Sequence, residues 1–290
     1  MLNLERITTE RNRKMQFYLT VITPKNVEAE MEYLTYGKTG LEISRLCFGA
    51  GRLGDTCKTH ESGAKLMLKA LDEGVTFWDT AEGYGTQPHL GEAIRQINRK
   101  EIVIQTKTAN KDHKSASASI EKALRELQTA YIDVMLLHAI SSPDDLATRE
   151  REGAFDAFRE AKAAGKVRVI GCSTHIYTGA VMDAVIDHPE IDVILTTANK
   201  EGRMLEGGSF EKHLEYIQRA YNLGKGISIM KVVVAGDIPE ADRPEWIEWG
   251  FNLETAHAIN LGMTEDQHIT LDVGLARASA RKRLVQSKAA

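Results

Sequence analysis

The chain has 290 residues, of which 42% are hydrophobic and 27% are charged. This balance is typical of a soluble globular protein, and the length suits one large α/β domain whose core needs no disulfide or metal. The formal net charge of -4 argues against a nucleic-acid-binding protein. No apolar run approaches the length of a membrane span, and three cysteines without a CxxC pair favour a reducing, cytoplasmic location.

Residues 1–30 differ from the rest of the chain and are expected to form an N-terminal extension. The basic run RNRK precedes the short apolar run QFYLTVI, but no small-residue cleavage site follows, which argues against a signal peptide. The regular pattern begins after this segment, so residues 31–290 are expected to form a single domain. Leu34 and Leu41 flank a Gly-Lys-Thr-Gly turn, which predicts a small β-hairpin that plugs the bottom of this domain.

Short apolar runs alternate with helical patterns along the rest of the chain. The first helix is predicted by Ala64, Met67, Leu68 and Leu71, which share one helical face and are followed by a stop at Gly74. Strands are expected at residues 46–50, 75–79, 101–106, 131–137, 167–173, 191–195, 227–230 and 257–261. Helices are expected around residues 64–71, 89–97, 120–127, 155–161, 181–185 and 210–221, and a long loop at 232–255.

This alternation predicts parallel βαβ units, and eight such units close into a (β/α)8 TIM barrel. A doubly wound open sheet is the alternative fold, and it should carry the pattern G-x-G-x-x-G between its first strand and first helix. The run CFGAGRLGD contains G-x-G but not the following glycine in register. The sequence therefore favours the barrel, with the N-terminal hairpin added to it.

Four polar residues lie at or shortly after predicted strand ends: Asp79, Tyr84, Lys107 and His138. In an α/β barrel the carboxyl ends of the strands meet on one face, where active sites are built. Carbonyl reduction needs a proton donor, and a tyrosine serves if a nearby lysine favours its phenolate. A buried lysine in turn needs an anion such as Asp79, and a histidine can orient the carbonyl oxygen.

Each of these residues also has a purely structural interpretation. Asp79 and Lys107 can form a structural ion pair, Tyr84 can pack its ring in a loop, and His138 can be a satisfied core histidine. The four residues together, in this order, favour the catalytic interpretation.

Several runs carry a family resemblance: TYGKTGLEISRLCFGAGRLG, GVTFWDTAEGYG, IQTKT, IDVMLLH and AAGKVRVIGCSTH. Together they resemble the successive signatures of the aldo-keto reductase superfamily, over roughly residues 31–199. The resemblance implies an (α/β)8 barrel with NADPH or NADH extended across its C-terminal face. It implies that Tyr84 is the general acid, that Lys107 tunes it and pairs with Asp79, and that His138 positions the substrate carbonyl.

The resemblance also implies a set of cofactor-binding residues, some of which depart from the family pattern. Thr174 replaces the asparagine of a Ser-Asn pair, and Leu195 and Ala198 replace a glutamine and a stacking tyrosine, which should reshape nicotinamide binding. The residues that carry over to this role are Gly51, Arg52, Asp79, Ser173, Thr174, Asn199, Lys231, Val232, Gly236, Gly262, Thr264 and Gln267.

The loop GMTEDQ resembles the segment that meets the adenosine end of the cofactor. A 2′-phosphate is best bound by Lys or Arg, whereas this loop carries Glu265 and Asp266, which favours NADH. Lys231 or Arg277 would favour NADPH instead. No metal site is expected, because none of the nine histidines falls in a tight ligand spacing.

The expected function is that of a nicotinamide-dependent oxidoreductase that reduces an aldehyde, ketone or sugar carbonyl. The expected partner is this small-molecule carbonyl substrate, with neither nucleic acid nor membrane involved. One alternative is a redox-neutral enzyme that retains its NAD(P) and catalyses epimerisation or elimination. Another is a regulatory barrel without catalysis; both alternatives are motivated by Thr174, Leu195 and Ala198.

Overall fold

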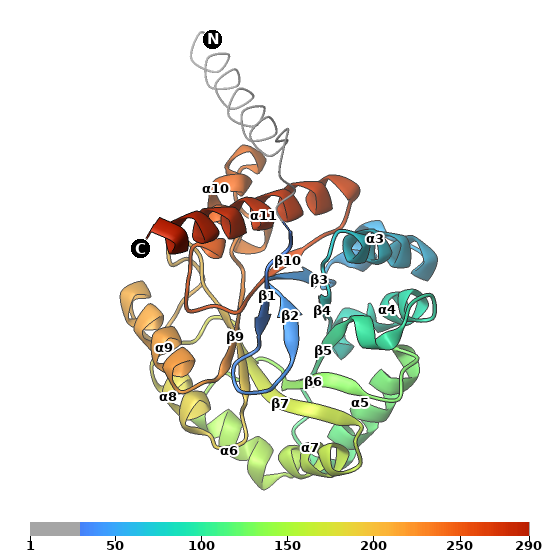
Figure 1. The fold of residues 1–290 in the computed structure, drawn as a ribbon. Helices are drawn as coiled ribbons and strands as arrows, with labels where there is room; N and C mark the ends of the chain where they lie inside the picture. The colour runs from blue at the N-terminus through green and yellow to red at the C-terminus, as the bar shows by residue number, and fades with distance from the viewer. Residues whose placement is uncertain (1–29, 290) are drawn as a thin grey trace, which may run out of the picture.

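The computed structural model describes residues 30–289, and the predicted extension at residues 1–30 lies outside this range except for its last residue. Eight parallel strands close into a barrel in the order β10-β3-β4-β5-β6-β7-β8-β9. In Figure 1 the helices form a ring around these strands. The fold is therefore the predicted (β/α)8 TIM barrel.

The strands fall where apolar runs predicted them. Their bounds are β3 Leu46–Gly49, β4 Phe77–Asp79, β5 Val103–Thr108, β6 Ile132–Leu137, β7 Val167–Thr174, β8 Val193–Thr197, β9 Gly226–Met230 and β10 Ala258–Gly262. Most of their residues are buried, as parallel strands must be when side chains fill the barrel inside and helices cover it outside. The barrel closes where β10 pairs with β3, with Ile259 opposite Leu46.

Helices follow the strands on the outside of the barrel. Those that the sequence predicted are α3 His60–Asp72, α4 Gln87–Ile94, α5 His113–Glu126, α7 Ala154–Ala163, α8 Ala180–Asp187 and α9 Phe210–Asn222. Two further helices were not predicted, α6 Pro143–Arg151 and α10 Arg243–Phe251, while α11 Asp266–Ala289 contains the basic cluster Arg277, Arg281, Lys282 and Arg283 that indicates a helix end in the sequence. Short turns complete the described chain: α2 Leu53–Thr56, η1 Glu82–Tyr84, η2 Arg99–Glu101, η3 Val234–Gly236 and η4 Glu240–Asp242.

The predicted hairpin consists of β1 Tyr33–Thr35 and β2 Glu42–Ser44, which pair antiparallel. It lies over the middle of the ring of helices in Figure 1. The side chains of Tyr36, Leu41 and Ile43 are buried in the cluster that fills the barrel interior. The turn itself packs closely, because a Cβ at Gly37 would lie 2.4 Å from the backbone nitrogen of Gly226. The hairpin thus closes the N-terminal end of the barrel.

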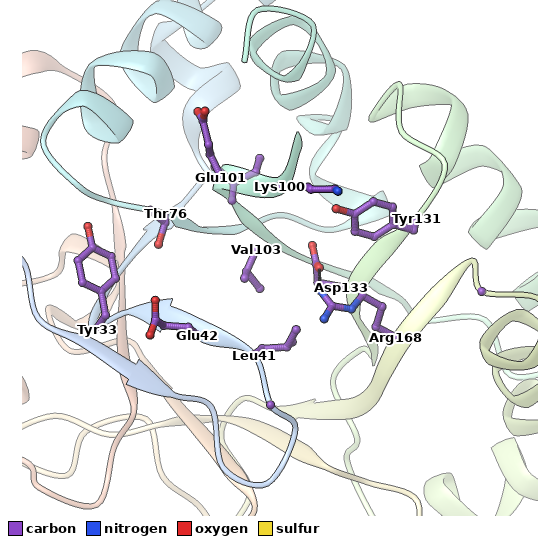
Figure 2. Close-up of a pocket in the computed structure, with 13 residues that line it drawn as sticks. Tyr33, Leu41, Glu42, Thr76, Lys100, Glu101, Val103, Tyr131, Asp133 and Arg168 are labelled. Carbon is purple, nitrogen blue, oxygen red and sulfur yellow. Dashed lines mark hydrogen bonds and ion pairs between the residues drawn. The ribbon is translucent and has the colours of Figure 1, made fainter. Parts of the chain in front are cut away.

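A cavity of about 600 Å³ lies at this N-terminal end, beside the hairpin. Figure 2 shows Leu41 and Val103 near its middle, with Asp133 and Arg168 at one side. The Arg168 guanidinium donates to Asp133 Oδ1 over 2.7 Å. Since barrel active sites lie at the opposite, C-terminal face, this cavity is not the expected reaction site.

Two searches of the described residues bear on membrane and metal binding. Between residues 30 and 289, no helix is both long and apolar enough to cross a membrane. Within the same range, no group of three histidine, cysteine, aspartate or glutamate side chains could hold a metal ion.

Candidate active site

The structure brings the four candidate catalytic residues together at the C-terminal face of the barrel. Asp79 is the last residue of β4, and Lys107 lies near the end of β5. Tyr84 ends the short turn η1 that follows β4, and His138 follows the last residue of β6. They meet because neighbouring parallel strands deliver their carboxyl ends to the same rim.

Lys107 and Asp79 form a buried ion pair. The Lys107 ammonium lies 2.7 Å from Asp79 and also donates to the backbone carbonyl of Thr80 over 2.7 Å. Burial lowers the pKa of Lys107, but the Asp79 carboxylate and the nearby Tyr84 outweigh it, so the net pKa is raised. Lys107 therefore stays charged at neutral pH.

The Tyr84 ring lies between this ion pair and His138. The Lys107 ammonium is 4.9 Å from the centroid of the Tyr84 ring. The ring centroids of Tyr84 and His138 are 5.6 Å apart, with an edge-on arrangement at 87°. Tyr84 is half-buried and lines a cavity, so its hydroxyl is accessible to a small molecule while its ring is held by two neighbours.

His138 is held in its neutral form. Burial, followed by the positive charge of Lys107, lowers its pKa to about 3. The guanidinium of Arg149 donates to the backbone carbonyl of His138 over 3.0 Å, which fixes the chain after β6. A neutral imidazole offers one donor and one acceptor, so His138 is suited to orient an oxygen atom rather than to supply a proton as an imidazolium.

Gln105 is a site residue that sequence reasoning missed. It lies two residues before Lys107 on β5, and its side-chain amide donates to Asp79 Oδ1 over 2.7 Å. It is fully buried. Because residues two apart on a strand point to the same face, its position relative to Lys107 was the signal that could have revealed it.

A cavity of about 370 Å³ opens beside these residues at the C-terminal face. Asp79 and Tyr84 line it, together with the apolar side chains of Leu195 and Met230. Most of the predicted cofactor residues also line it: Gly51, Arg52, Lys231, Val232, Gly236, Gly262 and Thr264. This cavity is therefore where the sequence-based prediction would seat a nicotinamide cofactor.

Ser173 and Thr174, predicted to hold the nicotinamide, are not among the residues that line the cavity. The Ser173 hydroxyl accepts from the backbone nitrogen of Ala139 over 2.9 Å. The Thr174 hydroxyl donates to the carbonyl of Tyr177 over 3.3 Å. Both side chains thus have protein partners, and their cofactor role stays a prediction.

Asn199 and Gln267 also lie outside the cavity lining. The fully buried Asn199 closes a loop, because its side chain both donates to and accepts from the backbone of Arg203. Gln267 is exposed in the first turn of α11. The loop predicted at GMTEDQ therefore gives way to a helix at Asp266.

Lys231 supplies an uncompensated positive charge to the cavity wall. Within the described part of the chain its ammonium makes no ion pair, and burial, then Lys107 and Arg52, lower its pKa. Its backbone is left-handed with φ of 61°, and the following Val234 and Ala235 have φ of 48° and 56°. Strained backbone of this kind gathers at ligand sites, which fits a site for an anionic group.

His175 was not predicted either, although it directly follows Ser173 and Thr174 and lines the cavity. Its ring centroid lies 5.2 Å from that of His138. Burial, followed by the charges of Lys231 and Lys107, lowers its pKa to about 4. Its Nδ1 atom is buried and has no hydrogen-bond partner among the described residues.

Comparison with known proteins identifies the family. The model of the aldo/keto reductase family matches residues 45–225, which is more than half of the chain and includes all four candidate catalytic residues. The chain belongs to the aldo/keto reductase family.

Individual relatives are distant. The chain is 32% identical to the aldo-keto reductase YhdN of Bacillus subtilis over 160 residues, which are 49% of this chain and 47% of that protein. It is 26% identical to the L-galactose dehydrogenase of Arabidopsis thaliana over 238 residues, 75% of this chain and 70% of that one. The chain spans about half the length of YhdN and of two further Bacillus subtilis oxidoreductases that it matches.

Solved structures share the fold. The aldo-keto reductase AKR11C1 from Bacillus halodurans, in its holo form, superposes with a TM-score of 0.69. The match covers 87% of this chain and 96% of that one at 19% identity. At this level of identity the likeness concerns the barrel architecture.

Proposed function

We propose that this protein is an NAD(P)H-dependent oxidoreductase that reduces an aldehyde, ketone or sugar carbonyl. The observation that carries the proposal is the cluster of Tyr84, the Lys107–Asp79 ion pair and His138, of which Tyr84 and Asp79 line the C-terminal cavity. Membership of the aldo/keto reductase family supports it.

The residues of this chain handle the proton. The Tyr84 hydroxyl donates its proton to the carbonyl oxygen, and the charged Lys107 stabilises the phenolate that remains. Asp79 keeps Lys107 charged and fixed in place, and Gln105 holds the other side of the Asp79 carboxylate. The neutral His138 donates a hydrogen bond that orients the carbonyl oxygen toward Tyr84.

The cavity fits a nicotinamide dinucleotide in its chemistry. Leu195 and Met230 give it apolar walls, and Lys231 gives it a cation without an ion-pair partner in the described chain. Lys231 and the backbone of Val232 to Gly236 would hold the pyrophosphate, with Gly51 and Thr264 along the same cavity. When bound, the cofactor supplies the hydride.

The part of the cavity that would hold the adenosine of the cofactor favours NADH over NADPH. Thr264 lines the cavity there and is followed in the chain by Glu265, and the carboxylates of Glu240 and Asp55 belong to the wall. Arg277, which would favour NADPH, is instead paired with Glu73 over 2.9 Å and lies outside the cavity lining. The guanidinium groups of Arg52 and Arg243 line the cavity but are already paired, with Asp55 and Asp272, so neither is free to bind a 2′-phosphate.

A redox-neutral enzyme with retained cofactor is the second candidate. It is favoured by the unusual nicotinamide end, where the apolar Leu195 lines the cavity and the Ser173 and Thr174 hydroxyls have protein partners. Cofactor that copurifies with the protein and does not exchange would support this candidate over the reductase.

The test begins with calorimetric titration of cofactor-free protein with NADH and, separately, NADPH. We expect tighter binding of NADH, and carbonyl-dependent oxidation of the tighter cofactor. Tyr84→Phe should bind the cofactor as the native protein does but lose about 100-fold or more in turnover, because only the proton donor is removed.

Tyr131→Phe is the matched control, since Tyr131 lies at the opposite end of the barrel, beside the N-terminal cavity. It should leave turnover unchanged. A Tyr84→Phe variant with native turnover would rule out Tyr84 as the acid. A folded protein that binds neither cofactor would rule out the proposed function.

A further inference from the structure

Two histidine rings lie side by side at the rim of the C-terminal cavity. Tyr84, His138 and His175 form a row, with ring centroids 5.6 Å apart for the first pair and 5.2 Å for the second. Tyr84 and His175 both line the cavity. The mechanism above uses Tyr84 and His138 and leaves His175 without a role.

His175 has unused hydrogen-bonding capacity. Neither ring nitrogen has a hydrogen-bond partner in the described chain: Nδ1 is buried, which leaves Nε2 as the nitrogen that can reach a molecule in the cavity. Burial lowers the pKa of His175 most, the Lys231 and Lys107 ammonium groups lower it further, and Asp79 opposes them. The ring is therefore neutral near pH 7 and offers one donor and one acceptor.

A single carbonyl oxygen accepts all that Tyr84 and His138 can donate, since it has two lone pairs. A further hydrogen-bonding group beside them can bind a second polar atom of the substrate. His175 is next in the row after His138, which favours a second polar atom close to the reacting oxygen.

We propose that His175 is a specificity-determining residue that binds an oxygen on the carbon next to the reacting carbonyl. The favoured substrates are then hydroxyaldehydes and hydroxyketones rather than simple aldehydes and ketones. This inference rests on the proposed carbonyl reduction and specifies the substrate class for the same site.

The experiment compares two substrates of equal length, lactaldehyde and propanal, which differ by the hydroxyl on the neighbouring carbon. NADH oxidation is followed for the native protein, His175→Leu and His175→Asn, and NADH affinity is measured for each. His113→Leu is the control, because it makes the same exchange at an exposed histidine on α5 that is absent from the cavity lining.

We expect His175→Leu to lower kcat/KM about tenfold to a hundredfold for lactaldehyde, to change it about twofold or less for propanal, and to leave NADH affinity intact. His175→Asn keeps a donor and an acceptor, so it should retain most of the preference for lactaldehyde. His113→Leu should match the native protein with both substrates.

Equal losses with both substrates, or a loss of NADH affinity in His175→Leu, would overturn the inference while leaving carbonyl reduction in place. Such a result would mean that the ring serves the cofactor or the fold. A native protein that oxidises neither NADH nor NADPH with these substrates or with any other carbonyl tested would overturn the proposed function and this inference together.

Discussion

The Lys107 side chain is fully buried, and Asp79 is its ion-pair partner. Two charges in a low-dielectric interior are tolerated only as a pair, because each loses its hydration. The Asp79 carboxylate therefore has two effects. It stabilises the buried Lys107 ammonium in the fold, and it keeps that ammonium charged next to the Tyr84 ring.

Replacing one partner separates these effects. Lys107→Met should abolish turnover and lower the free energy of unfolding by about 3–5 kcal/mol, because Asp79 is left as an unpaired buried charge. The double variant Lys107→Met with Asp79→Asn should recover much of that stability without recovering turnover. Urea denaturation and NADH oxidation measure the two quantities, and recovery of turnover in the double variant would contradict the catalytic role of Lys107.

The sequence could predict the candidate catalytic residues because each lies at or shortly after a strong apolar run. Asp79 and Lys107 lie at strand ends, and His138 directly follows one. Gln105 and His175 escaped prediction for a different reason. Their importance depends on which side chains they meet across the barrel, and apolar periodicity does not encode those contacts.

Among the elements, α10 and α11 are joined by an ion pair that the sequence did not suggest. Arg243, the first residue of α10, donates to both oxygens of Asp272 on α11 over 3.3 Å and 3.1 Å. Burial raises the pKa of Asp272 to about 7, against the opposing effect of Arg243. Arg243 also lines the C-terminal cavity, so this pair fixes α10 beside the site.

The raised pKa of Asp272 predicts how the stability of the protein changes with pH. Asp272 releases its proton near pH 3.9 in the unfolded chain but only near pH 7 in the folded protein. Its protonated form therefore stabilises the folded state fully below about pH 3.9, and this stabilisation is lost as the pH rises through about 7. Asp272→Asn has no such proton. Between pH 5 and pH 8 the free energy of unfolding of Asp272→Asn, measured by urea denaturation, should rise by on the order of 2–3 kcal/mol relative to that of the native protein.

The control is Asp266→Asn on the same helix, since Asp266 is exposed and its ion pair with Lys69 is a surface pair. Its stability difference from the native protein should change little over this range. A pH-independent difference for Asp272→Asn would mean that Asp272 keeps the same charge throughout and that the Arg243 charge fully offsets its burial.

Elements with a regular apolar spacing were predictable, and others were not. The strands and α3 have one clear pattern, as in Ala64, Met67 and Leu71. In α10 the buried residues follow a helical spacing, but Arg243 and Gly250 lie on the buried face and Trp249 lies outside it, so the apolar pattern of the sequence is blurred. Residues 232–255 were expected to be loop-rich because of Pro239 and Pro244, and they contain a helix with Pro244 in its first turn.

At the scale of the whole molecule, several histidines are buried in neutral form. Burial lowers the pKa of His138 to about 3, and those of His175, His213 and His257 to about 4. An unfolded histidine has a pKa of about 6.5. The unfolded chain therefore binds more protons than the folded protein between about pH 4 and pH 6.5, and folding becomes less favourable as the pH falls through this range.

The protein should accordingly be easier to unfold with urea at pH 5 than at pH 7. His213→Gln tests one contributor, because His213 is fully buried on α9 and contacts the Thr196 hydroxyl at 3.2 Å. The variant should reduce the pH dependence of the unfolding free energy by about 1.4 kcal/mol per pH unit within the window. An unchanged slope would show that His213 is not among the titrating groups.

The hairpin that closes the N-terminal end has a consequence for the order in which the chain acquires its structure. Tyr36 shares a hydrogen bond with Ser228, 192 residues later, and Arg45 donates to the carbonyl of Ala256. Contacts this far apart in the chain give a high contact order and a costly loop closure. A chain emerging from the ribosome can therefore pair its first barrel strand with β4 early, but the contacts of that strand and of the hairpin with β9 and β10 wait until nearly all of it has been synthesised.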